Sequence, residues 1–278
     1  MPDAKPELEP SAAPRVHYAR AEALPGIMLV TSSFRGNMPP STIDRRWVFA
    51  CTDVGDGDAS VGPSEIRLQP GVLLALEPGD CITPLRRRSA ESAFRTVLVE
   101  PEYAARFLET AFPNGGVKLR RGLLGDAALV AFDALWVAVM ASGAALEQEE
   151  LLAAFLESAS DVQSGLPPAE LTPLIARAKK LLEERFADDV RLEHLEAEIG
   201  LSRFYLVRRF RAEVGMPPHA FQLAMRLDRA RVLIAEGMAL SDVASRCGFT
   251  DQSHLTRHFR RATGVAPGAY ARSAGIRR

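Results

Sequence analysis

The stretch LSDVASRCGFTDQSHLTRHFRRATGVAPGAY, residues Leu240 to Tyr270, decides the fold of the C-terminal part of the chain. Its apolar residues first recur with helical spacing, and Gly248 then allows a tight turn at positive φ. Asp251 can cap a second helix, which Gly264 would end. A helix, a tight turn and a capped second helix form a helix-turn-helix, the motif that places its second helix in the DNA major groove.

The pattern occurs twice, at an offset of 49 residues. Leu206 and Leu255 match at this offset, and each is preceded by a short amphipathic segment that ends in glycine. The matching signatures are Arg208-x-Phe210-Arg211-x3-Gly215-x2-Pro218 and Arg257-x-Phe259-Arg260-x3-Gly264-x2-Pro267.

The repeat divides the C-terminal region into two units. The first helix-turn-helix is expected at about 192–213 and the second at about 240–263. Apolar residues between Pro217 and Glu236 predict one long connecting helix. Loop residues at 164–168, followed by Thr172 and Pro173 as an N-cap and a first helical residue, predict a domain over 172–275.

Charge is distributed unevenly along the chain. The whole chain has 34 basic and 35 acidic residues, a net charge of −1, which taken alone argues against a nucleic-acid partner. Residues 1–171 carry a net charge of −8, whereas residues 172–278 carry +7. From residue 201 onward there are 14 basic and 5 acidic residues, with arginine dominant. Because arginine suits phosphates and base edges, the C-terminal region is predicted to bind double-stranded DNA.

These two units resemble the DNA-binding domain of the AraC/XylS family of bacterial transcription regulators. The resemblance covers about a third of the chain and implies a bilobed, seven-helix domain with two recognition helices about one DNA turn apart. It rests on Ile199-Gly200-Leu201-Ser202, Leu206-x-Arg208-x-Phe210-Arg211, Val243-Ala244-x2-Cys247-Gly248-Phe249 and Gly264-Val265-Ala266-Pro267-Gly268-x-Tyr270.

In the first recognition helix, Ser202 is the expected cap. Arg208 is a candidate for a bidentate contact with guanine; a phosphate contact or a surface ion pair is the alternative. Phe204 could touch a thymine methyl group or pack between the lobes. Val207 stands where the family often has a polar base reader, so we expect weaker direct readout here. The base-edge candidates are Arg203, Phe204, Tyr205, Val207 and Arg208.

In the second recognition helix, Asp251 or Thr250 is the expected cap. Gln252 can pair with adenine, and Arg257 with guanine or a phosphate. His254 is a base reader or an ordinary surface residue. The base-edge candidates are Gln252, Ser253, His254, Thr256 and Arg257, and the phosphate candidates in the two helices are Arg211, Arg260 and Arg261.

The N-terminal half reads as short strands between Val16 and Val99. A Pro-Gly-rich strand pair at 70–80 resembles the cupin-like barrel that precedes the DNA-binding domain in many of these regulators. Helices are expected at 119–142 and 146–160, either as a dimer interface or packed on the barrel. The predicted class is therefore α+β with two domains. A disordered arm over 1–14 precedes a cupin-like effector-binding and dimerisation domain over 15–166, and the all-α DNA-binding domain follows over 172–275.

Metal chemistry finds little support in the sequence. Many cupins hold a metal on several histidines, but His17 is the only histidine before residue 194, so neither a metal nor another cofactor is expected. Three scattered cysteines predict free thiols in a reducing cytosol. The apolar stretch at 128–146 contains Asp133, which favours a packed helix over a membrane span.

The sequence therefore predicts a cytoplasmic, homodimeric transcription regulator that binds DNA and an unidentified small-molecule effector. RNA polymerase is a further partner that the resemblance allows. Phe34, Arg35, Trp47 and Phe49 are candidates for an effector pocket, with core or solvated positions as the alternative. Two other functions stay open: a constitutive DNA binder whose N-terminal domain only dimerises and, more remotely, a metal-dependent cupin enzyme.

Overall fold

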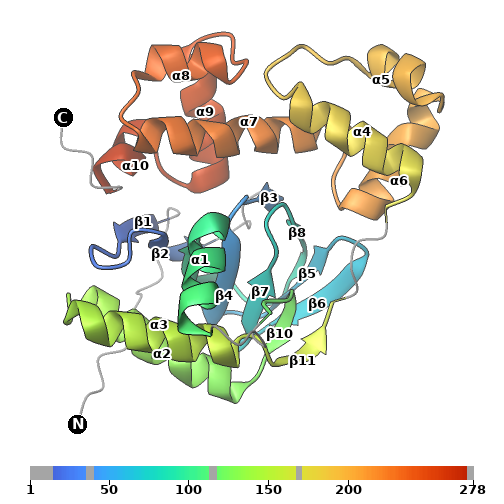
Figure 1. Cartoon of the computed structure of the whole chain (residues 1–278). Helices are drawn as coiled ribbons and strands as arrows, with labels where there is room; N and C mark the ends of the chain where they lie inside the picture. The colour runs from blue at the N-terminus through green and yellow to red at the C-terminus, as the bar shows by residue number, and fades with distance from the viewer. Residues whose placement is uncertain (1–14, 36–40, 113–117, 167–170, 274–278) are drawn as a thin grey trace.

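A computed structural model describes residues 15–35, 41–112, 118–166 and 171–273. The chain forms an N-terminal β-rich domain and a C-terminal helical domain (Figure 1), so the predicted fold class is confirmed. The expected arm, residues 1–14, lies outside the described residues.

The N-terminal domain contains two antiparallel sheets. The first has the strand order β1-β2-β9-β4-β7-β10-β11 and the second β3-β8-β5-β6. Strands occur between Val16 and Val99, where the sequence predicts them. The strands are β1 (Arg15–Arg20), β2 (Ile27–Arg35), β3 (Thr42–Ile43), β4 (Trp47–Val54), β5 (Gly57–Val61), β6 (Ser64–Leu68), β7 (Leu73–Leu76), β8 (Cys81–Arg87), β9 (Glu91–Val99), β10 (Gly122–Leu124) and β11 (Val162–Gly165).

Three helices cover one face of the larger sheet: α1 (Pro101–Ala111), α2 (Asp126–Met140) and α3 (Ala145–Ser158). Phe49 of β4 contacts Phe155 of α3 edge to face, with ring centroids 5.0 Å apart. Phe132 of α2 packs against the same Phe155 ring at 5.8 Å. These helices therefore pack on the barrel's own sheet, one of the two arrangements expected from the sequence.

The start of the expected helix at 119–142 is wrong. Residues Gly122–Leu124 form β10, which pairs with β7 and β11 in the larger sheet. Helix α2 begins at Asp126, after Gly125 in extended backbone. The apolar stripe that predicted a helix over residues 119–125 belongs to a short buried strand, because three residues are too few for periodicity to separate the two structures.

Asp133, which interrupts the apolar stretch of α2, is paired inside the domain. Its carboxylate lies 2.8 Å from Arg95 of β9, and Arg95 also pairs with Asp53 of β4 at 2.8 Å. The Arg95 guanidinium lies over the rings of Phe132 and Trp136. This cluster fastens α2 to the sheet, since an unpaired buried charge would be costly.

The C-terminal domain has seven helices within residues 171–273, arranged as two helix-turn-helix units joined by α7. Phe210 and Phe259, at matching places in the repeat, are fully buried in separate cores. The helices are α4 (Pro173–Glu184), α5 (Leu192–Ile199), α6 (Arg203–Val214), α7 (Pro218–Ala235), α8 (Leu240–Arg246), α9 (Gln252–Thr263) and α10 (Pro267–Ser273).

Gly248 is required by the turn of the second unit. Its φ is +73°, and a Cβ atom at this position would lie 2.0 Å from the carbonyl oxygen of Ala187. Both the left-handed backbone and this close approach exclude a side chain. The turn of the second unit is thereby packed against the segment that precedes α5.

The helical domain rests on the barrel with α7 crossing near β3 (Figure 1). Tyr18 of β1 meets Tyr270 of α10 edge to face, with ring centroids 4.8 Å apart. At the other lobe, the Thr83 hydroxyl of β8 donates to the carbonyl oxygen of Gly215, at 3.2 Å. Both lobes therefore touch the barrel.

Within the part of the chain that the structure describes, no helix is long and apolar enough to cross a membrane.

Candidate DNA interface and effector cavity

The first turn of α6 is solvent-exposed. Phe204 is 91% exposed and Tyr205 44%, and Arg208 is also exposed, whereas Val207 is half-buried. Phe204 therefore does not pack between the lobes in this structure, which leaves its contact with a thymine methyl group as the prediction. The arrangement puts two aromatic rings and one guanidinium on a single surface.

Arg203 is held by the preceding helix. Its guanidinium lies 2.7 Å from the Glu193 carboxylate and 3.3 Å from that of Glu196, both on α5. These pairs fix α6 against α5 across the turn. To read a base, Arg203 would have to exchange these carboxylates for the DNA.

The first turn of α9 is capped by Asp251, whose carboxylate accepts from the His254 backbone N–H at 2.7 Å. Gln252, Ser253 and Arg257 are exposed, and Thr256 is half-exposed. The Gln252 amide and the Arg257 guanidinium form no ion pair or side-chain hydrogen bond with any other described residue.

His254 is partly engaged within its own unit. Its ring lies 4.7 Å from the His258 ring and 5.5 Å from that of Phe249, centroid to centroid. Its Nδ1 accepts from the Thr250 backbone N–H at 3.4 Å. These contacts support the alternative role of His254 as an ordinary residue of the helix surface.

The three phosphate candidates lie near the C-terminal ends of the recognition helices. Arg211, Arg260 and Arg261 are all exposed. Arg211 and Arg261 line a cleft beside the barrel, together with Thr83 of β8. Arg211 lies one turn after Arg208, and Arg260 and Arg261 lie one turn after Arg257, so the phosphate candidates directly follow the base-edge candidates along each helix.

A cavity of about 230 Å³ lies between the two sheets of the barrel. Phe34, one of the four candidate pocket residues, lines it with Val48 and Ala50 of β4. Arg231 of α7 and Thr263 of α9 reach its mouth, so the helical domain contributes to its wall. The remaining lining is largely aliphatic, which suits an apolar ligand body.

The other three predicted pocket residues lie elsewhere, and this corrects the prediction. Trp47 and Phe49 belong to the core between the sheet and the helices, on the opposite face of β4 from the cavity. Arg35, the last residue of β2, pairs with Glu91, the first residue of β9, at 2.8 Å. The sequence shows that residues of a strand alternate between faces, but not which face encloses the cavity.

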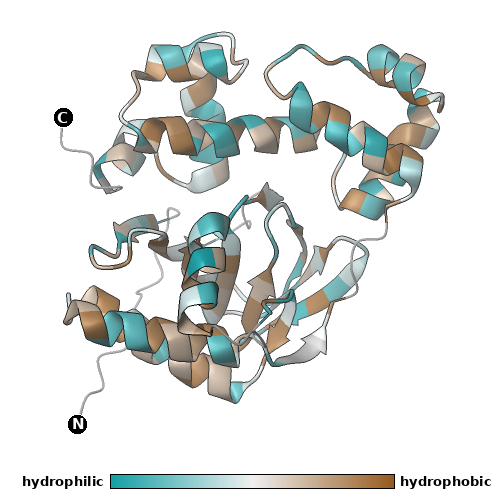
Figure 2. Cartoon of the chain, viewed as in Figure 1, coloured by the Kyte–Doolittle hydropathy of each residue, from teal (hydrophilic) through white to brown (hydrophobic). Residues whose placement is uncertain are grey.

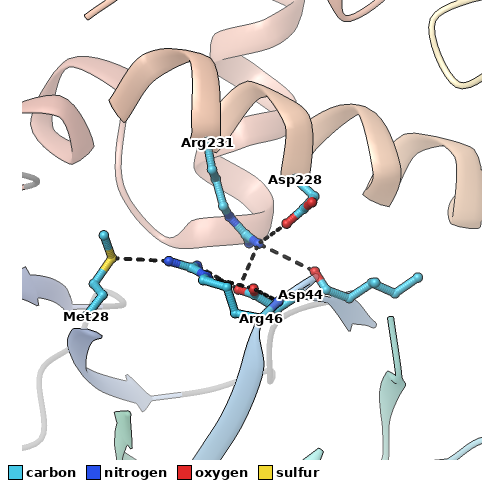
Figure 3. Close-up of polar contacts among 6 residues, drawn as sticks. Met28, Asp44, Arg46, Asp228 and Arg231 are labelled. Carbon is cyan, nitrogen blue, oxygen red and sulfur yellow. Dashed lines mark hydrogen bonds and ion pairs between the residues drawn. The ribbon is translucent and has the colours of Figure 1, made fainter. Parts of the chain in front are cut away.

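A charged cluster that the sequence did not predict forms part of the cavity wall, and Figure 3 shows its side chains. Asp44 accepts two hydrogen bonds from the Arg46 guanidinium, each 2.8 Å long. From α7, Arg231 lies 3.6 Å from Asp44 and 4.0 Å from Asp228. The cluster joins the barrel to the helix that connects the two DNA-binding units.

The two carboxyl groups of this cluster have opposite pKa shifts. Burial alone would raise the pKa of Asp44, but the guanidinium groups of Arg46 and Arg231 outweigh it and hold that pKa below its ordinary value. Burial, followed by the charge of Asp44, raises the pKa of Asp228 to about 6. Asp44 is thus the carboxylate to which both arginines are bound.

One sequence signal could have identified part of this cluster. Asp228 and Arg231 stand three residues apart on α7, within the buried stripe that also contains Leu227 and Ala230. Charged residues at core-facing positions of a helix need partners, and here those partners come from another domain. The contribution of Asp44 and Arg46 carries no comparable signal in the sequence.

No group of three or more His, Cys, Asp or Glu side chains within the described ranges is placed to hold a metal ion.

Comparison with known proteins gives matches over the C-terminal region and over most of the chain. Residues 195–273 match a family described as a helix-turn-helix domain. An uncharacterized HTH-type transcriptional regulator, YbfI of Bacillus subtilis, is 25% identical over 83% of this chain and 87% of that protein. The transcriptional activator RhaS of Escherichia coli is 34% identical, over 31% of each chain.

Among solved structures, ToxT of Vibrio cholerae, bound to (E)-4-(8-methylnaphthalen-1-yl)but-3-enoic acid, aligns over 88% of this chain and 99% of its own. The TM-score is 0.48 and the sequence identity 11%.

Proposed function

We propose that this chain is a transcriptional regulator of the AraC/XylS family and that it reads DNA with the first halves of α6 and α9. We further propose that a small molecule in the barrel cavity controls how these helices are presented. The proposed base readers are Arg203, Phe204, Tyr205, Val207 and Arg208 on α6, and Gln252, Ser253, His254, Thr256 and Arg257 on α9.

One geometric observation carries the DNA proposal: both recognition helices meet the barrel with their last turns. Gly215, after α6, accepts from Thr83 of β8, and Thr263 of α9 reaches the cavity mouth. A helix of 12 residues is about 18 Å long, so the first turns are held well away from the barrel. Two exposed helix starts, carried on one rigid connecting helix, suit two successive segments of major groove.

The DNA proposal is tested by the salt dependence of duplex binding by the full chain, measured by fluorescence anisotropy. We expect log Kd to rise steeply and linearly with log salt concentration, with a slope of about 0.9 for each phosphate contact. Arg260→Ala should lower that slope by about 1. The control Lys180→Ala removes an exposed charge on α4 that pairs with Glu184 and is not among the DNA-contact candidates, and it should leave the slope unchanged. A flat salt response in the parent protein would contradict the proposal.

The effector proposal rests on the cavity and its mouth. The lining combines a long apolar interior with the charged groups of Asp44, Arg46 and Arg231 at one end. A molecule that reaches this end touches the barrel and α7 together, so its affinity depends on how the two domains are docked. Such differential affinity shifts the population between domain arrangements.

A metabolite library screened by thermal shift tests the effector proposal on the full chain. A cognate ligand should raise the melting temperature of the parent protein. Ala50→Phe fills the cavity and should abolish that shift, whereas Ala154→Phe on the exposed side of α3 should preserve it. A shift that survives Ala50→Phe would place the ligand elsewhere. The absence of any stabilising ligand would favour the constitutive DNA binder.

The same proposal includes a homodimer formed through α2. Val130 is 69% exposed, Val137 56% and Met140 54%, and the first two lie on one face of the helix (Figure 2 shows the hydrophobic residues of the α2–α3 pair in brown). A contiguous exposed apolar stripe of this kind is typical of an interaction surface. Val130→Glu with Val137→Glu should convert a dimer into a monomer in sedimentation velocity, and Leu174→Glu on α4 is the matched control. A monomeric parent protein would contradict the dimer.

A further inference from the structure

A second hollow lies outside the barrel, between β3, β8 and the two lobes of the helical domain. Its volume is about 480 Å³. Ser41 and Thr42 line it from the barrel side, and the last turns of α6 and α9 line it from the other side. It shares Thr42, Ile43, Arg231 and Ala262 with the barrel cavity, whereas Arg211, His219, His258 and Arg261 line this hollow alone. We call it the interlobe cleft.

Basic side chains converge on the interlobe cleft from three helices. Arg211 of α6, His219 of α7, and His258 and Arg261 of α9 all line it. No aspartate or glutamate is among the described residues that form its wall. The nearby carboxylates of Asp44 and Asp228 are already engaged by Arg46 and Arg231.

The two arginines of the cleft differ from other arginines of α6. Arg209, two residues before Arg211, lies 2.6 Å from the Glu213 carboxylate. Arg203 is likewise paired with carboxylates of α5. Arg211 and Arg261 have no ion pair with any residue that the structure describes. The cleft therefore holds positive charge that the protein itself does not neutralise.

The lowered pKa of His258 is consistent with the same excess of positive charge. Burial lowers its pKa, and the positive charges of His254, Arg257, Arg261 and His219 lower it further. An anion bound in the cleft would relieve this repulsion and raise that pKa.

The start of α7 adds backbone donors to the wall. Its N-cap is Pro217, and no side chain caps the helix. The N–H groups of His219 and Ala220, in the first turn, have no acceptor within the helix. Because the helix dipole is positive at this end, an anion in the cleft would be favoured by both the backbone and the side chains.

We propose that the interlobe cleft binds a small, multiply charged anion carrying two or more carboxylate or phosphate groups. Two arginines from different lobes need at least two anionic groups, and the first turn of α7 supplies donors between them. Bound there, the anion would join β3 of the barrel to both recognition helices and stabilise the docked arrangement of the domains. The site is separate from the barrel cavity of the proposed function.

A DNA backbone phosphate is the competing occupant of Arg211 and Arg261. Arg211 and Arg261 follow the proposed base readers Arg208 and Arg257 by three and four residues, and they line a cleft whose opposite wall is formed by Ser41, Thr42 and Thr83 of the barrel. Because the barrel lies against this side of both helices, the cleft has room for a small anion rather than for a duplex. The geometry therefore favours a small anion.

Isothermal titration of the full chain with citrate and with inorganic pyrophosphate tests the proposal, at constant ionic strength set with chloride. We expect saturable binding of at least one probe, and the preferred probe separates carboxylate from phosphate recognition. Arg211→Gln with Arg261→Gln should weaken binding about tenfold or more, because each loses a charge-assisted contact. Arg209→Gln, on the same helix but outside the cleft and paired with Glu213, should stay within about twofold of the parent protein.

Two further measurements separate this site from its alternatives. The pH midpoint of the His258 ring proton, followed by NMR, should rise when the anion binds. Ala50→Phe should leave anion binding intact, so failure of the barrel proposal would not remove this one. Binding that persists in the double arginine variant, or equal weak effects of every anion, would overturn the proposal. The anion-binding proposal would also be contradicted if Arg211→Gln with Arg261→Gln, in the absence of added anion, lost as much DNA affinity as Arg257→Ala does. That result would make Arg211 and Arg261 contacts to DNA.

Discussion

The two helix-turn-helix units share a framework but differ in the surface that each presents. Leu206 and Phe210 of α6 are fully buried, as are Leu255 and Phe259 of α9. Both helices end at a left-handed glycine. The matched apolar residues and glycines build the fold, whereas the matched arginines, Arg208 with Arg257 and Arg211 with Arg260, are exposed; most of the residues between these positions have diverged.

The divergence is greatest in the first turn of each recognition helix. On α6, Ser202 occupies the cap position without a side-chain hydrogen bond, and Phe204 extends into solvent. On α9, Asp251 caps the helix, and Gln252 and Arg257 are exposed polar groups. The comparison predicts that the second unit reads bases by hydrogen bonding, whereas the first contributes more through apolar contact and Arg208.

The largest expected effect tests the shared framework. Leu206→Ala and Leu255→Ala should each destabilise the helical domain by about 2–5 kcal/mol, because each leaves a cavity in a fully buried core. Chemical denaturation followed by circular dichroism measures this. Similar losses in the free energy of unfolding would show that the two cores contribute equally to stability. A loss below about 1 kcal/mol from either substitution would show that they do not.

The next effect tests the difference in base reading. Arg257→Ala should weaken binding to a duplex selected by the parent protein by about 1–3 kcal/mol. Binding to duplexes of random sequence should change much less. Arg208→Ala is the matched substitution in the first unit, and we expect a smaller loss of discrimination from it. Equal losses on selected and random DNA would make Arg257 a phosphate contact.

The caps give a smaller contrast. Asp251→Ala should lower the free energy of unfolding by about 1 kcal/mol, because the His254 N–H would lose its acceptor. Ser202→Ala should change it by no more than a few tenths of a kcal/mol, since Ser202 makes no cap hydrogen bond. Equal effects of the two substitutions, measured by urea denaturation, would remove this difference between the units.

The smallest expected effect on stability belongs to Phe204. Its side chain is 91% exposed, so Phe204→Ala should change the free energy of unfolding by less than about 0.5 kcal/mol. The same substitution should weaken binding to the selected duplex, because the ring would lose its contact with the groove. Unchanged DNA affinity would show that Phe204 has no part in the interface.

The helical domain could be predicted from the sequence because its signals are local. The offset of 49 residues, the glycine at each turn and the apolar spacing place α5 to α9 to within a few residues of the observed bounds. The expected connecting helix from Pro217 to Glu236 is α7, Pro218–Ala235.

The sites between the domains could not be predicted, because they depend on contacts distant in the sequence. Asp44 and Arg231 are separated by 187 positions, and nothing near Asp44 indicates its partner. Trp47 and Phe49 look like pocket residues, yet the alternation of β4 turns them into the core and leaves Val48 and Ala50 facing the cavity. Composition and periodicity identify elements, but the docking of elements decides which side chains meet.

Selection of bound sequences from a pool of random duplexes tests the central claim most directly, because it uses the full chain and requires no defined operator. We expect two enriched half-sites about one helical turn apart, with the sharper base preference in the half-site read by α9. Arg257→Ala should flatten the sharper half-site and leave the other intact. A pool without enrichment, or a single half-site that neither Arg257→Ala nor Arg208→Ala alters, would contradict the claim that α6 and α9 read DNA as an unequal pair.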